Sequence, residues 1–447
     1  KSDAKLLEAY HDGLTADEKI AKTITRDRLK HFHDLNNSGS LFQHRAYLST
    51  VYRPTSKRKA TPLNSLVNKT LGRKSTYQSL SKLELISRRA RALQLRDGLL
   101  RYLLQAGFEA RPLGARDLFE VPYRYFNPGS SIPNYETPSL YYPERFLKHF
   151  PEFSPTTLRR QIADSDLDNN PYDHLWLSGH YIVGLTMEKL PDDMTFPSLI
   201  SSLITLPCEK WIAVTMEHVP FAKQLNAFKW KARLLRGFTS ETGDDVDPTN
   251  ESGFNTYRQA IGHMTLDNSH VYRVGLSMFI YAEKLEEAEH YLQQAQIMAS
   301  EMQGAKFMRE RAGLSKRFRT LAPFAGGMSD IADLVFQENA ADFVPLMGPY
   351  RGNTKEPDLL YQTRYDTPMG LTVFDQSCKN WNGIIVGAAR SGKSFHANDI
   401  LAGVLRRDDV DAIIIDKGGS FKETVKLYGG AYIEVENEAI NPFDLPE

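Results

Sequence analysis

One eight-residue motif constrains the fold of this chain more than any other feature of the sequence. Residues 387–394 read Gly-Ala-Ala-Arg-Ser-Gly-Lys-Ser, which satisfies the phosphate-binding pattern G-x-x-x-x-G-K-[ST]. The apolar run 384–386 predicts a short buried strand before the loop, and Ala397, Ile400 and Leu401 recur at helical spacing after it. Because the motif needs this strand–loop–helix context, the sequence predicts that the chain binds a nucleoside triphosphate.

Each part of the loop has a predicted role. Backbone N–H groups of the loop and the positive end of the following helix would hold the phosphates. Lys393 would reach the β- and γ-phosphates of ATP and is the candidate catalytic residue, and the Ser394 hydroxyl would complete the shell of a Mg²⁺ ion. The predicted nucleotide-binding residues are Gly387, Ala388, Ala389, Arg390, Ser391, Gly392, Lys393, Ser394 and Phe395.

Asp416 is a second candidate for the magnesium site, because it ends the apolar run 412–415. A carboxylate there could hold Mg²⁺ through water. The alternative, which we prefer, is that this run is simply the second strand of the sheet and that Asp416 opens a turn into Gly418 and Gly419. After Phe443 the chain nears its end without another apolar strand ending in Asp-Glu, so the catalytic glutamate and an arginine finger are expected elsewhere.

Bulk composition narrows the class of protein. The formal net charge is +0, which gives no global signature of a nucleic-acid binder. Cys208 and Cys378 are too few for a disulfide framework or a zinc site, so we expect a reducing cytoplasm. No run of apolar residues reaches the length of a membrane-spanning helix, and Val274–Ala282 is expected to be a core strand.

Charge is nevertheless uneven along the chain. Residues 53–96 contain 12 lysines and arginines against the single acid Glu84. Two interpretations stay open, a solvated surface or a patch that faces membrane headgroups or an acidic protein partner. Aromatic residues are sparse in this stretch, which argues against a surface on which bases stack.

We predict three consecutive domains: an α/β subdomain at 1–165, a second α+β subdomain at 166–345, and a nucleotide-binding domain from 346 to 447. In the first subdomain we expect helices at 6–10, 16–21 and 79–106, a strand at 47–52 and a loop at 123–142. In the second we expect strands at 174–178, 181–187, 211–217 and 271–282, helices at 197–206, 221–235, 283–302 and 309–321, and an acidic loop at 239–253. In the third we expect strands at 359–366, 370–375, 384–386, 412–416 and 431–435, and helices at 394–407 and 421–428.

The fold class is therefore an α+β N-terminal region followed by the opening part of a parallel α/β domain. The acids Asp244, Asp245 and Asp247 of the predicted loop match no calcium-binding spacing, so we interpret them as a solvated turn.

Several short motifs from residue 345 onward occur together with the phosphate loop. They are Pro345-Leu346, Leu359-Leu360-Tyr361, Thr372–Asp375, Ile414-Ile415-Asp416, Gly429–Tyr432 and Ile440–Phe443. With these motifs the chain resembles the large ATPases of type IV secretion and conjugation machines, the TraC/TrbE (VirB-type) group. Residues 166–345 are similar to this family more loosely, and residues 1–165 only in outline.

This resemblance implies a RecA-like P-loop motor domain with a parallel sheet that binds ATP between the subunits of a hexamer. It places Gly387, Gly392, Lys393 and Ser394 at the phosphates and Mg²⁺, whereas Ala389-Arg390 departs from the small residues of relatives. It also implies that the N-terminal region meets other subunits of the secretion machine, and further cytoplasmic ATPases, at the cytoplasmic face of the bacterial inner membrane. The motor domain is expected to be truncated before its Walker B strand.

The expected function is thus an ATPase subunit that energises pilus assembly and substrate export. Two alternatives stay open: an FtsK/HerA-like translocase acting on DNA itself, and a docking platform whose motor part is not catalytically complete. The sequence does not decide whether the exported substrate is DNA or protein, nor whether the chain binds nucleic acid directly.

Overall fold

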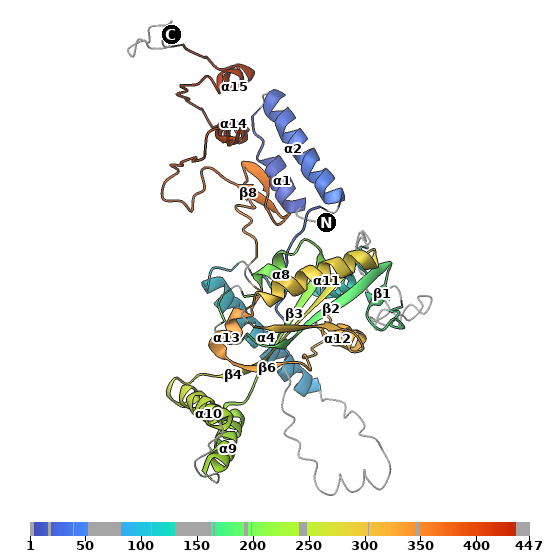
Figure 1. Cartoon of the computed structure of the whole chain (residues 1–447). Coiled ribbons are helices and arrows are strands. Elements are labelled where there is room, and N and C mark those ends of the chain that lie inside the picture. Colours follow the sequence, from blue (N-terminus) through green and yellow to red (C-terminus); the bar gives the residue numbers. More distant parts are fainter. Residues whose placement is uncertain are drawn as a thin grey trace. The chain divides into compact units, whose positions relative to one another are not determined.

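The computed structural model describes most of the chain, and its residues fall into two compact units (Figure 1). One unit comprises residues 1–45, 200–209 and 345–447, and the other comprises 46–199 and 210–344. The division into three consecutive domains at 165 and 345 stays a prediction. The described residues are 4–16, 19–38, 40–51, 82–108, 110–129, 162–163, 166–191, 195–197, 199–240, 248–302, 304–345 and 348–434.

The unit of residues 46–199 and 210–344 is built on a six-stranded sheet with the central order β1-β2-β4-β3. β2 pairs antiparallel with β1, β4 and β5, and β4 pairs antiparallel with β6. The strands are β1 Leu175–Leu177, β2 His180–Lys189, β3 Glu209–His218, β4 Val271–Ala282, β5 Lys306–Glu310 and β6 Asp333–Phe336. The predicted strands 174–178, 181–187, 211–217 and 271–282 are confirmed, and β5 and β6 were not foreseen.

Tyr125 lies at the centre of the core beside this sheet. Its ring stacks on Phe318 with 4.5 Å between ring centroids, and its hydroxyl donates to the Phe318 carbonyl at 2.8 Å. Tyr281 of β4 donates back to the Tyr125 carbonyl at 3.2 Å, so the buried hydroxyls are satisfied. Burial raises the pKa of Tyr125 well above its usual value.

Helix α11 (Leu285–Ser300) buries one face against β2, β4 and β5. Ala288, Leu292, Ala295 and Ala299 form this face, as the predicted stripe at three- and four-residue spacing requires. Arg309 of β5 ties strand to helix through Glu289 on α11, with a hydrogen bond of 2.9 Å. The remaining helices of the unit are α4 Lys82–Gln105, α5 Ala115–Phe126, α9 Phe221–Ser240, α10 Pro248–Leu266, α12 Leu314–Thr320 and α13 Gln337–Asp342.

Gly184 of β2 shows why a small residue is needed where α12 meets the sheet. A Cβ at this position would lie 2.6 Å from Leu314 Cδ1 and 3.1 Å from the Cβ of Glu310. A larger side chain there would have to displace the side chains of Leu314 and Glu310, which explains the preference for glycine at this close approach of strand and helix.

The unit that holds the phosphate loop brings together segments from the two ends of the chain. Helices α1 and α2 pack on the β7–β8 hairpin, with Leu6, Tyr10, Phe32 and Leu360 in one buried cluster. The phosphate-loop helix α14 packs on the same hairpin, where a Cβ at Gly403 would lie 2.5 Å from Leu359 Cγ. The elements are α1 Ala4–Asp12, α2 Lys19–Asn37, α8 Ser201–Thr205, β7 Leu359–Gln362, β8 Pro368–Leu371, α14 Lys393–Val404 and α15 Lys422–Leu427.

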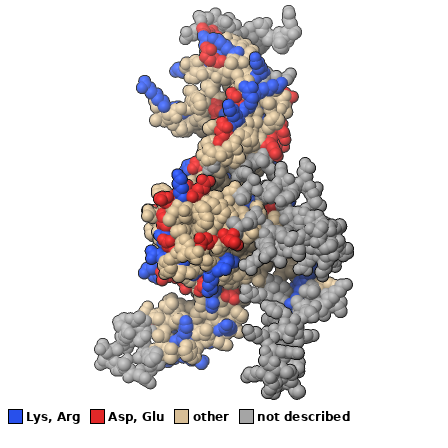
Figure 2. Space-filling view, turned by 90° about the vertical axis from the view of Figure 1, so that its right-hand side faces the viewer, with Lys and Arg blue, Asp and Glu red and all other residues tan. Residues whose placement is uncertain are grey.

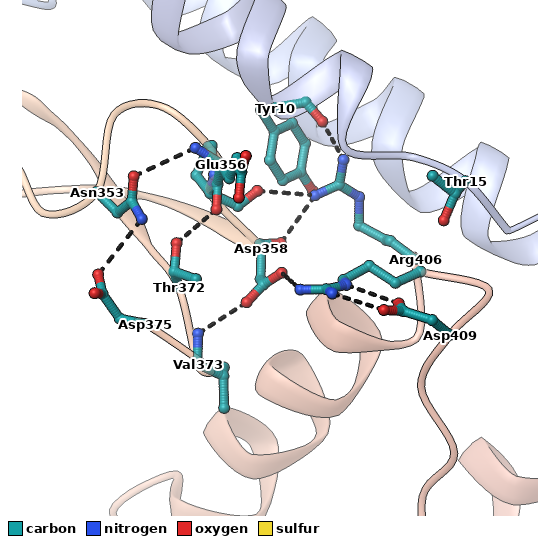
Figure 3. A network of polar contacts seen from close by, with 12 residues as sticks. Tyr10, Thr15, Asn353, Glu356, Asp358, Thr372, Val373, Asp375, Arg406 and Asp409 are labelled. Atoms are coloured by element: carbon teal, nitrogen blue, oxygen red, sulfur yellow. Dashed lines mark hydrogen bonds and ion pairs between the residues drawn. The ribbon is translucent and has the colours of Figure 1, made fainter. Parts of the chain in front are cut away.

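Arg406 joins these segments (Figure 3). Its residue is 1% exposed, and its guanidinium carbon lies 3.5 Å from the centroid of the Tyr10 ring. It donates to Thr25 Oγ1 at 2.9 Å, to the Asp358 carbonyl at 2.9 Å and to the Tyr10 carbonyl. Burial lowers the pKa of Arg406, and the cation is held by these acceptors and by the face of the ring.

Backbone hydrogen bonds next to Arg406 also join these segments. The N–H groups of Thr15 and Ala16 donate to the Arg406 carbonyl at 3.0 and 2.9 Å. Burial raises the pKa of the Asp358 carboxyl, and the Val373 N–H, which donates to it at 2.8 Å, acts in the opposite direction. The C-terminal end of α14 is thus fixed to the first 16 residues and to the β7–β8 hairpin.

Several predicted elements differ from the structure. Residues 47–51 form no strand, and α10 begins at Pro248 inside the predicted acidic loop, whose acids at 244–247 lie outside the described residues. Part of 309–321 is β5, and the predicted loop 123–142 begins inside α5, because packing on the sheet outweighs local pattern. The helix at 79–106 is confirmed as α4, whereas 52–81 of the basic stretch lie outside the description.

Replacing the buried arginine tests whether it holds the unit together. We expect Arg406→Met to lower the free energy of unfolding by about 2–4 kcal/mol, because the carbonyls it serves would be buried without donors. Urea unfolding followed by circular dichroism measures the loss. Arg26→Met is the matched control, since Arg26 is 74% exposed and its pairing with Asp27 should contribute less than about 1 kcal/mol. An equal loss of unfolding free energy in the two variants would contradict the conclusion that Arg406 holds the unit together.

A second prediction concerns Asp117 in the first turn of α5. Arg111 donates to its carboxylate at 2.7 and 2.8 Å, and the Gly114 N–H donates at 2.8 Å. These bonds lower its pKa to about 2 from the usual 3.8. The ionised form is favoured in the folded state, so its contribution is complete above about pH 4 and is lost as pH falls toward about 2. We expect Asp117→Asn to flatten acid unfolding in that window, measured by circular dichroism.

Candidate nucleotide-binding site

The phosphate loop ends where α14 begins. Gly392 caps the helix and Lys393 is its first residue, so the positive end of a 12-residue helix opens onto the loop. The Lys393 ammonium folds back and donates to the carbonyls of Gly387 at 3.0 Å and Ala388 at 2.7 Å. When a nucleotide binds, its phosphate oxygens would replace these two carbonyls as acceptors of the hydrogen bonds from the Lys393 ammonium.

Two glycines have stereochemical reasons to occupy their positions in the loop. Gly392 has φ +90°, a left-handed conformation that residues with a Cβ rarely adopt. A Cβ at Gly387 would lie 2.5 Å from Ser391 Oγ, so a larger residue there would require the Ser391 side chain to move. Arg390 also has a positive φ, 64°, and its side chain extends from an exposed turn.

Asn398, which the sequence did not single out, connects the loop helix to the next segment. Its amide donates to the Ser394 carbonyl at 2.9 Å and to the Ser420 carbonyl at 3.4 Å, while Thr424 donates to its oxygen at 2.5 Å. The turn at 416–421 therefore lies beside the first turns of α14. The sequence feature that could have predicted this connection is an asparagine one helical turn after Ser394.

Asp416 uses both of its carboxylate oxygens to form that turn. The N–H groups of Phe421 and Gly418 each donate to it at 2.9 Å, and they hold its pKa below the usual range. This geometry agrees with the turn interpretation of Asp416. A role in holding Mg²⁺ stays a prediction, as do the roles of Lys393 and Ser394.

Asp399, on the side of α14 that packs on the unit, anchors the helix a second time. Tyr361 of β7 donates to its carboxylate at 2.9 Å, and Arg28 of α2 forms an ion pair with it. The side chains of Arg28 and Asp399 are 16% and 19% exposed, so solvent screens this pair only in part. Burial and the bond to Asp399 raise the pKa of Tyr361. The helix that presents the loop is thus fixed near its middle and at its end.

The strands predicted around the loop are absent from the described residues. Residues 384–386, 412–416 and 431–434 run as irregular chain, and Ile413 and Ile415 are 98% and 100% exposed. A strand inside a parallel sheet needs hydrogen-bonded neighbours and helices on its faces, and the described part of the chain supplies neither here. The expected parallel sheet is therefore not shown, and the sheet that the structure does contain has antiparallel pairs. The helices predicted at 394–407 and 421–428 correspond to α14 and α15, but α14 already ends at Val404.

Metal binding and membrane spanning can both be judged from the residues that the structure describes. No group of three or more His, Cys, Asp or Glu side chains is arranged to hold a metal ion among them. Within the same residues, no helix is both long and apolar enough to cross a membrane.

Comparison with protein families now adds to this geometry. Residues 362–447 match the family model of the TraG P-loop domain. The match contains the loop, α14, the Asp416 turn and α15, and it identifies this segment as similar to a conjugation-related, TraG-like P-loop ATPase. Such a domain implies nucleotide binding, usually with Mg²⁺. Residues 1–361 lie outside the match, and comparison with curated proteins gives no match.

The stereochemistry of the loop gives a direct test. We expect Gly392→Val to weaken ATP binding at least about tenfold, because a β-branched residue at φ +90° costs about 1–2 kcal/mol and distorts the loop. Titration calorimetry with Mg·ATP measures the change. Gly383→Val is the control, since no heavy atom lies within 4 Å of a Cβ placed there. Unchanged affinity in Gly392→Val would contradict the assignment of this loop as the phosphate site.

Proposed function

We propose that the chain is an ATPase subunit of a type IV secretion or conjugation system, of the TraC/TrbE group. ATP with Mg²⁺ binds at residues 387–394, and its hydrolysis by the assembled motor energises pilus assembly and substrate export at the inner membrane. The observation that carries the proposal is the loop itself, with Lys393 folded over it at the start of α14. The TraG-type match across the same residues supports the link to conjugation.

The proposal includes a RecA-like arrangement that the described residues do not form. Residues 384–386 and 412–415 are apolar at every position. Continuous apolar runs are typical of strands that are buried on both faces of a parallel sheet. We propose that these runs become neighbouring parallel strands in the assembled motor, with the phosphate loop at their carboxyl ends. Open α/β sheets bind their ligands at that edge.

The same proposal includes three further features: assembly as a hexamer, contacts with other subunits of the secretion machine, and a place at the cytoplasmic face of the inner membrane. They rest on the resemblance of the motifs from residue 345 onward. Action directly on DNA is the competing function within the enzyme class. Two results would favour that competing function. DNA affinity would depend strongly on salt and would persist in Lys393→Ala, and DNA would stimulate ATP turnover by the unsubstituted protein.

The proposed activity is tested on the assembled protein by removing the loop lysine. We expect Lys393→Ala to weaken ATP binding at least about thirtyfold, since hydrogen bonds to charged groups contribute about 2 kcal/mol, and to abolish turnover. Lys379→Ala is the control, because Lys379 is an exposed lysine outside the loop and outside the 416–421 turn. ATP binding is measured by calorimetry and turnover by phosphate release.

The outcome separates a motor from a docking platform. Loss of turnover and of pilus assembly in Lys393→Ala, with the variant still incorporated into the machine, supports the motor. Unchanged secretion alongside lost nucleotide binding would leave only the platform function.

A further inference from the structure

Helices α9 and α10 form a hairpin that projects from the sheet, at the bottom of Figure 1. Its base is buried through Phe228 of α9, Met264 of α10 and Val271 at the start of β4. Gln224 and Ala232 share the buried side of α9 with Phe228, at four-residue spacing. One face of α9 is thereby accounted for by packing inside the unit.

The opposite face of α9 exposes two large apolar side chains. Trp230 is 63% exposed and Leu234 is 45% exposed, and they lie four residues apart, so they are neighbours on the helix surface. Lys223 and Arg233 lie on the same outward face at helical spacing. A tryptophan contributes one of the largest apolar areas of any residue, so its exposure beside a leucine favours a binding surface.

The charge of α9 has one sign. Its 20 residues include no Asp or Glu, and they include Lys223, Lys229, Lys231, Arg233 and Arg236. Lys231 lies over the ring of Tyr257 on α10, with 5.5 Å from Nζ to the centroid, so this cation stays beside the hairpin. Figure 2 shows lysine and arginine side chains on the described surface of the hairpin, where it forms the lower left lobe.

We propose that this outward face of α9 binds the anionic headgroups of a lipid bilayer. The cations would contact the headgroups, and Trp230 and Leu234 would enter the boundary between headgroups and acyl chains. Basic residues on the flanks with Trp and Leu on the contact face are the pattern of helices that lie in a membrane interface. The interaction concerns residues outside the phosphate loop and does not depend on the proposed ATPase function.

A nucleic acid fits the same surface less well. Binding of single strands combines a basic groove along the backbone with several aromatic side chains on which successive bases stack. The outward face of α9 presents one tryptophan and an aliphatic neighbour on a single helix, which suits the lipid boundary better. Nucleic acid is therefore an outcome that the experiment must distinguish.

Vesicle binding by the full chain tests the proposal. Co-sedimentation is measured with vesicles of phosphatidylcholine alone and of an equimolar mixture with phosphatidylglycerol, and we expect binding to the anionic mixture only. Lys229→Glu with Arg233→Glu should weaken that binding at least about tenfold, because each basic residue near the surface contributes attraction to anionic lipid. Trp230→Ala should also weaken it, and brominated lipid should quench the part of the tryptophan fluorescence that this variant loses.

The control is a double variant with the same change of charge on another helix. Arg26→Glu with Lys30→Glu alters two exposed basic residues four apart on α2, and it should leave vesicle binding unchanged. Equal losses in the two double variants would overturn the proposal, because general charge would then explain the binding. Lys393→Ala should retain full vesicle binding, which separates this test from that of the ATPase function.

Two further outcomes would also overturn it. The α9 double variant could lose affinity for an oligonucleotide while vesicle binding persists, which would assign the face to nucleic acid. Trp230→Ala could convert an oligomer to a smaller species by light scattering with vesicle binding unchanged, which would assign the face to a second copy of the chain.

Discussion

The burial of one cation, Arg406, determines how the nucleotide-binding unit is built. A guanidinium removed from water needs acceptors in several directions, and here separate segments of the described chain supply them. The Tyr10 ring and carbonyl, the Thr25 hydroxyl and the Asp358 carbonyl supply them from α1, α2 and the start of β7. Because the buried cation needs these acceptors, Tyr10 near the beginning of the chain is held against Arg406, which lies 396 positions later.

This constraint has a consequence for the phosphate loop. Arg406 fixes the end of α14, and Asp399 fixes its middle through Arg28 and Tyr361. In the first turn of the helix, Ser394 remains exposed and Lys393 is partly exposed. A helix held at two points positions its free N–H groups before any ligand arrives, so little ordering entropy remains for nucleotide binding to overcome. The N-terminal helices thereby contribute to the site without touching it.

How much was predictable from the sequence depended on the range of the interactions involved. Helices α14 and α15 and the strand at 271–282 follow from local patterns, and the structure confirms these elements. Arg406 lies inside the helix predicted at 394–407, yet α14 ends at Val404 and the side chain is buried. Its partners lie hundreds of residues away, and spacing along the chain carries no signal for them.

The strands predicted at 384–386 and 412–416 are absent from the described residues for a related physical reason. An apolar run predicts what a segment would become when neighbours pair with it, whereas the strand forms only if those neighbours are present. Exposed side chains such as Ile384, Val386, Ile413 and Ile415 each gain about 1.5–3 kcal/mol on full burial. Four such side chains are comparable to the stability of a small domain, about 5–15 kcal/mol, so covering them favours strand formation strongly. Burial of these side chains also explains why the proposed motor sheet would form together with the assembly, since neither run is stable as a strand by itself.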